Sequence, residues 1–160
     1  MRLIIRTIII SFVLIVLHAT LVNVLTIVNA VPNILIIWLV YIAITAGQLS
    51  STVAGFCLGL FVDIISGGIM GLSALSNTIA GFIAGYFYNE NKVEQNLSTW
   101  TFVVVVGIAA VLHNAVFFTI FLQGMEISWW RALMLHGIPS SVYTIVVGAI
   151  PMFVFRRKYQ

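Results

Sequence analysis

Asp63 is the residue of this sequence whose position most needs a chemical explanation. The chain has only four acidic residues, and this one lies within the apolar stretch GFCLGLFVDIISGGIMGLSAL at residues 55–75. A carboxylate at the centre of a membrane helix costs about 2.5–3.5 kcal/mol on insertion scales. We therefore expect a compensating partner, and a role in structure, in ion movement or in partner recognition is open.

Three kinds of group could compensate the charge of Asp63. Arg131 and His136 are predicted to lie on the same side of the membrane. Backbone N–H groups are also free where the next helix begins after Gly68, and such groups bind carboxylates well. These N–H groups are the least costly partner, so we expect Asp63 to fix the hairpin between two helices. A proton or ion relay is the alternative, but a relay usually needs several acidic or histidine groups in series.

The sequence contains no pattern typical of catalysis or metal binding. His18, His113 and His136 fall in three different predicted helices, and there is no HxxxH, CxxC or paired-carboxylate motif. Hydrogen-bonded core histidines are the simpler interpretation. Cys57 is the single cysteine, so an internal disulfide is excluded. We expect a non-enzymatic protein without metal or cofactor.

The composition is that of an integral membrane domain. Hydrophobic residues make up 62% of the chain and charged residues 7%, with a mean hydropathy of +1.17. Soluble domains carry about 25% charged residues, so this chain has too few to cover a surface that faces water. The net charge of +3 does not indicate nucleic-acid binding, because the basic residues cluster at the two ends. We expect one transmembrane domain over residues 1–160.

Apolar runs separated by polar, glycine or proline breaks predict an all-α bundle of six transmembrane helices. The predicted helices cover approximately residues 7–28, 33–47, 51–66, 69–88, 98–123 and 132–155. The second and third are short for a bilayer of about 30 Å, so we expect them to be tilted, partly re-entrant or packed against each other. The first run is longer than the roughly 7–15 apolar residues of a signal peptide, and we expect it to be retained.

The distribution of Lys and Arg predicts the orientation of the bundle. With six spans and a cytoplasmic N-terminus, all of the seven Lys and Arg residues except Arg131 lie on the cytoplasmic side. An odd number of spans would place one basic end on the wrong side of the membrane. We therefore expect both termini in the cytoplasm.

Small residues at helical spacing predict close packing between helices. Gly55, Gly59 and Asp63 follow one another at i, i+4 and i+8, which places them on one helical face. Small residues four apart let a second backbone approach closely. The other glycines that we expect on such faces are Gly81, Gly85, Gly137 and Gly148. We expect seams inside the bundle, with a partner-binding seam as the alternative.

The stretch around Asp63 resembles the signature region of the bacterial rod shape-determining MreD family. The pattern is G-F-x-x-G-L-x-x-D-x-x-S-G followed by G-L-x-A-L. The matching positions are Gly55, Phe56, Gly59, Leu60, Asp63, Ser66, Gly67, Gly71, Leu72, Ala74 and Leu75. A basic N-terminus and Pro32 at the start of the second predicted helix also fit the family, whereas Asn33 stands where many relatives have Asp. The specific part of the resemblance covers about residues 31–90.

The resemblance implies a multi-pass subunit of the bacterial elongation (Rod) complex in the inner membrane. Such a subunit binds MreC directly, within the membrane and on its periplasmic side. Through MreC it is linked to MreB filaments, to RodA and to a class B penicillin-binding transpeptidase, and so helps to control cell shape and peptidoglycan synthesis. We expect the MreC contact on the predicted helices 7–28, 51–66 and 69–88 and near Trp129 and Trp130.

Two alternatives belong to another functional class. MreD-like proteins are thought to resemble the substrate-binding S components of vitamin transporters of the energy-coupling-factor type. A subunit of that kind would present polar groups to an outward pocket, and the candidates here are Asp63, Asn77, His113 and Arg131. The second alternative is another small membrane carrier or a lipid-binding protein.

Overall fold

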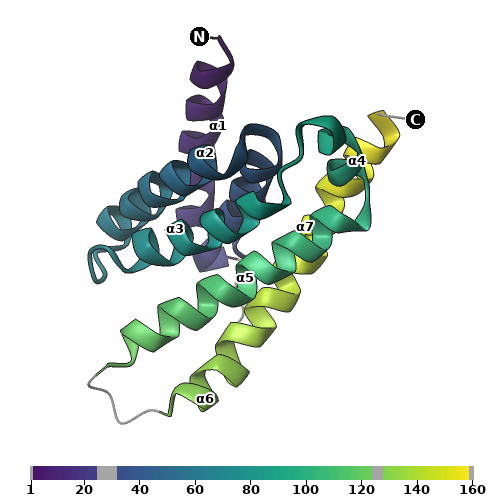
Figure 1. The fold of residues 1–160 in the computed structure, drawn as a ribbon. Helices are drawn as coiled ribbons and strands as arrows, with labels where there is room; N and C mark the ends of the chain where they lie inside the picture. The colour runs from purple at the N-terminus through teal and green to yellow at the C-terminus, as the bar shows by residue number, and fades with distance from the viewer. Residues whose placement is uncertain (1, 25–31, 124–127, 159–160) are drawn as a thin grey trace.

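The computed structural model describes residues 2–24, 32–123 and 128–158, and every regular element in these ranges is a helix (Figure 1). The elements are α1 (Arg2–Val24), α2 (Ile34–Ser66), α3 (Leu72–Ala84), the 3-10 turns η1 (Gly85–Phe87) and η2 (Glu90–Lys92), α4 (Val93–Ser98), α5 (Trp100–Phe121), α6 (Trp129–Ala132), the π-helical turn η3 (Leu133–Gly137) and α7 (Ile138–Lys158). The predicted all-α class is confirmed. The end of the first predicted helix, residues 25–28, lies outside the described residues.

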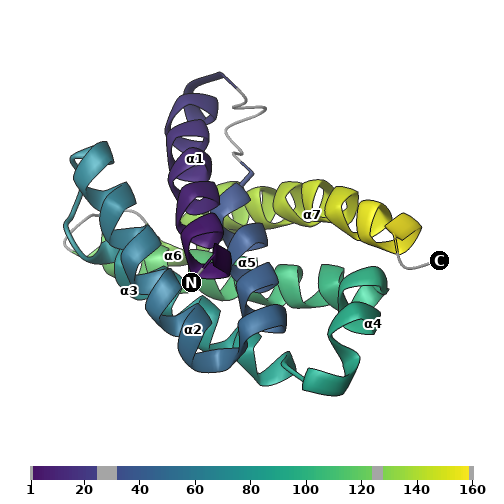
Figure 2. The same cartoon turned by 90° about the horizontal axis from the view of Figure 1, so that it is seen from above.

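Helix α2 covers both the second and the third predicted helix. The two parts meet at Gly47, whose φ of 86° and ψ of 179° interrupt the helix, and they run in different directions (Figures 1 and 2). Positive φ favours glycine because it has no Cβ. The predicted polar break at residues 47–51 is therefore a corner of one residue, after which the helix resumes at once.

Polar side chains after Gly47 remain helical because they bond to backbone carbonyls. Ser51 Oγ donates to the carbonyl oxygen of Gly81 at 2.9 Å, and Gln48 Nε2 donates to that of Phe82 at 3.1 Å. Both bonds join α2 to α3. Residues that resemble a loop in the sequence are thus part of a helix–helix contact, where interhelical hydrogen bonds stabilise packing in a membrane.

The part of α2 after Gly47 packs against α3 as an antiparallel hairpin, and α3 in turn packs on α5 (Figure 1). A Cβ added at Gly55 would lie 2.5 Å from the carbonyl oxygen of Asn77, and one at Gly81 would lie 2.6 Å from that of Ser51. A Cβ at Gly59 would overlap the backbone of Ser73 and Ala74, and one at Gly85 that of Gln48. The two backbones therefore touch along this glycine seam, which consists of Gly55, Gly59, Gly81 and Gly85.

The remaining core lies between the first part of α2, α5 and α7. Ile36, Val40 and Phe102 are 0% exposed, and Met152 of α7 is 1% exposed. Both ribbon views place α5 beside α7 (Figures 1 and 2). Gly148 of α7 is less tightly packed than the glycine seam, because an added Cβ would meet only side chains, Val106 Cγ1 being nearest at 3.1 Å.

The exterior is apolar over much of its area. Phe12, Phe61, Trp100 and Val146 are each more than half exposed. Soluble monomers rarely expose such contiguous apolar surface. Among the described residues, the helical stretches Ile34–Ser66, Trp100–Phe121 and Trp129–Arg157 are long and apolar enough to cross a membrane. A membrane bundle is therefore plausible, and the topology of six spans stays a prediction.

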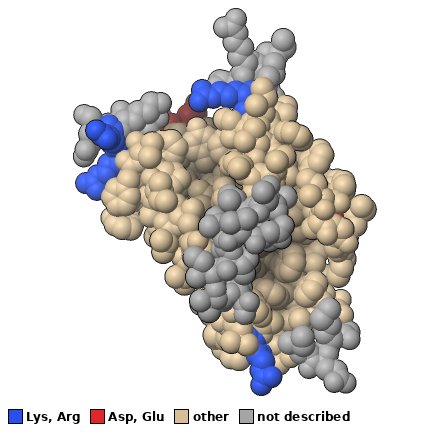
Figure 3. All heavy atoms as spheres, turned by 180° about the vertical axis from the view of Figure 1, so that it is seen from behind, with Lys and Arg blue, Asp and Glu red and all other residues tan. Residues whose placement is uncertain are grey.

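Basic side chains gather at opposite ends of the molecule on the face that Figure 3 shows. The start of α1, with Arg6, and the end of α7, with Arg156 and Arg157, lie toward one end, together with α4 (Figure 1). Helix α6, with Arg131, lies at the other end. The predicted orientation, in which Arg131 is the exception, requires such a separation of charge, and the orientation itself stays a prediction.

Candidate functional site

The Asp63 carboxylate binds the start of α3. Asp63 lies near the C-terminal end of α2 and is 4% exposed. The backbone N–H groups of Gly71, Ser73 and Ala74 donate to its two oxygens at 2.9, 3.0 and 3.2 Å. The first N–H groups of a helix have no partner within the helix, and the helix dipole favours negative charge there. Asp63 thus supplies the capping group that Gly71, at the N-cap of α3, lacks.

Glycines shape the turn that brings these groups together. Gly67 has a φ of 63° and Gly71 a φ of 94°, both in the left-handed region. A Cβ at either position would meet nothing within 4 Å, so conformation rather than space favours glycine there. Ser66 adds a weak bond from its Oγ to the carbonyl oxygen of Asp63 at 3.4 Å.

The other candidate partners of Asp63 lie elsewhere. Arg131 belongs to α6 and His136 to η3, and both are exposed. Within the described part of the chain, neither forms a hydrogen bond or ion pair with Asp63. The expectation of a core histidine is wrong for His136, because η3 turns this residue outward.

The remaining signature residues divide between the hairpin and the exterior. Leu72 is 5% exposed and begins α3 inside the bundle, and Leu60 is half-buried. Phe56 is 51% exposed. Phe56 is therefore free to contact lipid or a partner helix.

A polar cavity of about 530 Å³ lies beside the Asp63 hairpin, between α1, α2, α3 and α5. Its polar lining comes from His18, Asn33, Ser66, Ser73, Asn77 and His113. Among the described residues, the buried side-chain atoms without a hydrogen-bond partner are Nδ1 of His18, Oδ1 of Asn77 and Nδ1 of His113. All three line this cavity. Because buried polar atoms normally have partners, the cavity suits water or a small polar molecule.

Asn33 holds one wall of this cavity in place. Its side chain caps α2 by accepting from the Ile36 N–H at 3.3 Å, and its own N–H donates to Thr144 Oγ1 of α7 at 2.9 Å. Its Nδ2 lies 3.5 Å from His113 Nε2. In the sequence, Asn33 stands out only as a departure from the family pattern. Asn33 and Thr144 are far apart in the sequence, so no local pattern predicts their hydrogen bond.

Asn114 makes a second link of this kind, between α5 and the π-helical turn. Its Nδ2 donates to the carbonyl oxygen of Gly137 at 3.0 Å and to Ser141 Oγ at 2.9 Å. A π-turn shifts the backbone hydrogen bonds of a helix and leaves carbonyl groups for other donors. Among the described residues, no group of three or more His, Cys, Asp or Glu side chains is placed to hold a metal ion.

An apolar groove runs between α1 and the corner and second part of α2. Its volume is about 580 Å³, and its lining includes Phe12, Val53, Cys57 and Phe61. These four residues are exposed. The groove suits the apolar face of another helix.

One comparison with known proteins agrees with the family resemblance seen in the sequence of the Asp63 hairpin. The family model described as rod shape-determining protein MreD matches residues 1–158. No curated protein and no solved structure gives a significant match to the chain. The family match covers the Asp63 hairpin, the polar cavity and the apolar groove alike.

Proposed function

Because this chain belongs to the rod shape-determining protein MreD family of bacterial membrane proteins, we propose that it is a non-enzymatic scaffold subunit of the elongation (Rod) complex. The family match over residues 1–158 is the observation that carries the proposal. In this role the chain binds MreC in the inner membrane. Through MreC it is linked to MreB, RodA and a class B penicillin-binding transpeptidase during peptidoglycan synthesis.

We further propose that the membrane helix of MreC occupies the apolar groove between α1 and α2. Association in lipid gains little from the hydrophobic effect, so a partner needs a surface that its side chains can fill. The groove offers such a surface, because its lining includes the rings of Phe12 and Phe61 and the small residues Ala54 and Cys57. The lining of the groove comes partly from residues 7–28 and 51–66, which are two of the three predicted helices where we expect the MreC contact.

The exposed Cys57 allows a direct test of this contact. We expect Cys57 to form a disulfide with cysteines placed along the membrane helix of MreC, at positions three or four residues apart that share one helical face. The measurement is oxidative cross-linking in membranes, read on a non-reducing gel. A chain with Cys57→Ser and Val146→Cys is the control, since Val146 is 62% exposed on α7.

The two parts of the proposal fail separately. If MreC co-purifies but Cys57 gives no more cross-linking than the Val146→Cys control, the groove is the wrong surface and the scaffold function stands. If a tagged chain recovers no MreC from mild detergent, the scaffold function itself is contradicted.

A second candidate function is the binding of a small polar molecule, as in an S component of an energy-coupling-factor transporter. The observation that favours it is the polar cavity, where three buried atoms have no hydrogen-bond partner among the described residues, including Oδ1 of Asn77 and Nδ1 of His113. These two residues belong to the set expected for such a pocket. Arg131 does not line the cavity.

The variant Asn77→Leu distinguishes the scaffold function from the binding of a small polar molecule in the cavity. Replacing an unsatisfied buried acceptor by an apolar group of similar size changes stability by less than about 1 kcal/mol. A scaffold therefore keeps its melting temperature, its MreC binding and the rod shape of cells that depend on it. Loss of rod shape in a variant that still folds and binds MreC would contradict a scaffold role alone and favour a function for the cavity.

A further inference from the structure

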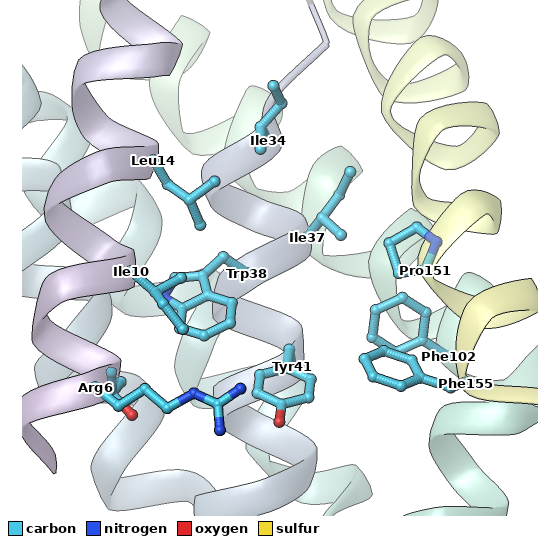
Figure 4. Close-up of a pocket in the computed structure, with 11 residues that line it drawn as sticks. Arg6, Ile10, Leu14, Ile34, Ile37, Trp38, Tyr41, Phe102, Pro151 and Phe155 are labelled. Atoms are coloured by element: carbon cyan, nitrogen blue, oxygen red, sulfur yellow. The ribbon is translucent and has the colours of Figure 1, made fainter. Parts of the chain in front are cut away.

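A crevice of about 530 Å³ lies between α1, the first part of α2, α5 and α7. Figure 4 shows Arg6, Ile10 and Leu14 of α1 on one side and Ile37, Trp38 and Tyr41 of α2 in the middle. Pro151 and Phe155 of α7 and Phe102 of α5 lie on the far side. The crevice thus lies between helices that are separate in sequence.

One wall of the crevice is a row of stacked rings. The rings of Trp38 and Tyr41 lie 5.0 Å apart at 14°, and those of Tyr41 and Phe155 lie 5.6 Å apart at 13°. Trp38 Nε1 donates to Ser11 Oγ at 2.9 Å, which satisfies the one polar atom of the indole. The row therefore presents a long apolar surface whose shape is set by packing, as an acyl chain requires.

Arg6 brings a positive charge to one end of this crevice. Among the described residues, Arg6 is the one charged residue of the lining, and Figure 4 shows the guanidinium extending across the lower end of the crevice toward Tyr41. Within the described residues, Arg6 is exposed and no ion pair with an acidic side chain is found for it. Arg156 and Arg157 follow Phe155 directly on α7 and are also exposed. Arg6 therefore supplies a cationic group at one end of a crevice whose remaining lining is largely apolar.

We propose that this crevice binds one anionic phospholipid of the cytoplasmic leaflet. The acyl chain lies against the ring wall between α1 and α7, and the phosphate binds the Arg6 guanidinium. The planar guanidinium binds phosphate through two parallel N–H bonds, and basic pockets between membrane helices on the cytoplasmic side take anionic head groups. The apolar lining favours a phospholipid over free phosphate. This inference uses the predicted orientation and goes beyond the scaffold function.

Native mass spectrometry of the full chain tests the proposal. The probe is an equimolar mixture of dioleoyl phosphatidylglycerol and dioleoyl phosphatidylcholine in mild detergent. We expect one retained phosphatidylglycerol, preferred about fivefold over phosphatidylcholine, which corresponds to one basic side chain near the membrane surface. Arg6→Gln is expected to remove the preference, while Arg131→Gln at the opposite end keeps it. Addition of inorganic phosphate is expected to leave the bound lipid in place.

A second variant tests the acyl part of the site. Ile10→Trp fills the crevice from α1 and keeps Arg6, so it is expected to lower the retention of both lipids. Circular dichroism and MreC co-purification on the same samples report whether each variant folds and assembles. Equal retention of the two lipids by the wild-type chain, or an equal effect of Arg6→Gln and Arg131→Gln, overturns the proposal and leaves the scaffold function untouched.

Discussion

Asp63→Ala is expected to lower the free energy of unfolding by about 2–5 kcal/mol. The substitution removes three hydrogen bonds from backbone N–H groups to a carboxylate, at 2.9, 3.0 and 3.2 Å. Hydrogen bonds to a charged group contribute about 1.5–3 kcal/mol each, and the N–H groups left behind are poorly hydrated. Part of this loss is offset, because alanine also removes the cost of placing a carboxylate in the membrane.

Asp63→Asn provides the matched comparison. An amide oxygen at the position of Oδ2 keeps the bonds from Gly71 and Ala74, but the amide nitrogen then faces the Ser73 N–H. We therefore expect a loss between zero and that of alanine, at about 1–2 kcal/mol. Unfolding in increasing SDS, followed by circular dichroism in dodecyl maltoside micelles, measures both variants.

The same pair of variants separates the structural role from an ion relay. A structural role predicts that stability, MreC binding and rod shape decline together, more for alanine than for asparagine. A relay predicts that both variants fold and assemble normally and lose the movement of an ion. The hydrogen bonding of the carboxylate argues for the structural role, because each of its oxygens already accepts at least one bond from the backbone of α3 or its N-cap.

The hairpin around Asp63 was predictable because its causes are local. The spacing of Gly55, Gly59 and Asp63 places them on one helical face whatever the rest of the fold. The need of a buried carboxylate for N–H donors points to the nearest helix start. The three hydrogen bonds of Asp63 to the start of α3 are the contact that this argument predicts.

The rest of the site depends on contacts that no local pattern encodes. Gln48 and Ser51 resemble loop residues, and only the backbone of α3 beside them makes a helix favourable there. The bond from Asn33 to Thr144 needs α7 to return beside the start of α2. The polar cavity and the crevice beside Arg6 also depend on contacts between distant segments, since each is lined by α1, α2 and at least one later helix.

Among glycine-to-alanine substitutions in the hairpin, Gly59→Ala is expected to cause the largest loss of stability. Its Cβ would overlap the backbone at Ser73 and Ala74, and backbone cannot move aside as a side chain does. Overpacking of a filled interior costs about 1–3 kcal/mol, and the gain in helix propensity from glycine to alanine returns at most about 1 kcal/mol. Because the clash is with backbone, we expect a cost in the upper part of this range, about 2–3 kcal/mol, and hence a net loss of about 1–3 kcal/mol in the same SDS unfolding experiment.

Gly148→Ala is the matched control, because it adds the same methyl group to another apolar helix. There the nearest atom is a methyl group of Val106 at 3.1 Å, which a small rotation relieves. We expect the free energy of unfolding to change by no more than about 1 kcal/mol in either direction. A small gain is consistent with this expectation, because alanine favours the helix. Equal losses at Gly59 and Gly148 would show that the glycine seam has no special need for close approach.

Combining Gly59→Ala with Asp63→Ala tests whether the seam and the carboxylate form one unit. A methyl group at Gly59 pushes the start of α3 away from α2, and the same movement lengthens the bonds from Ser73 and Ala74 to Asp63. Part of the energy of those bonds is then already lost in Gly59→Ala. The double variant should therefore lose less stability than the two single losses added together, by about 0.5–3 kcal/mol, as for residues in direct contact. Simple additivity would mean that the two features act separately, and that Asp63 holds α3 even when the helices are forced apart.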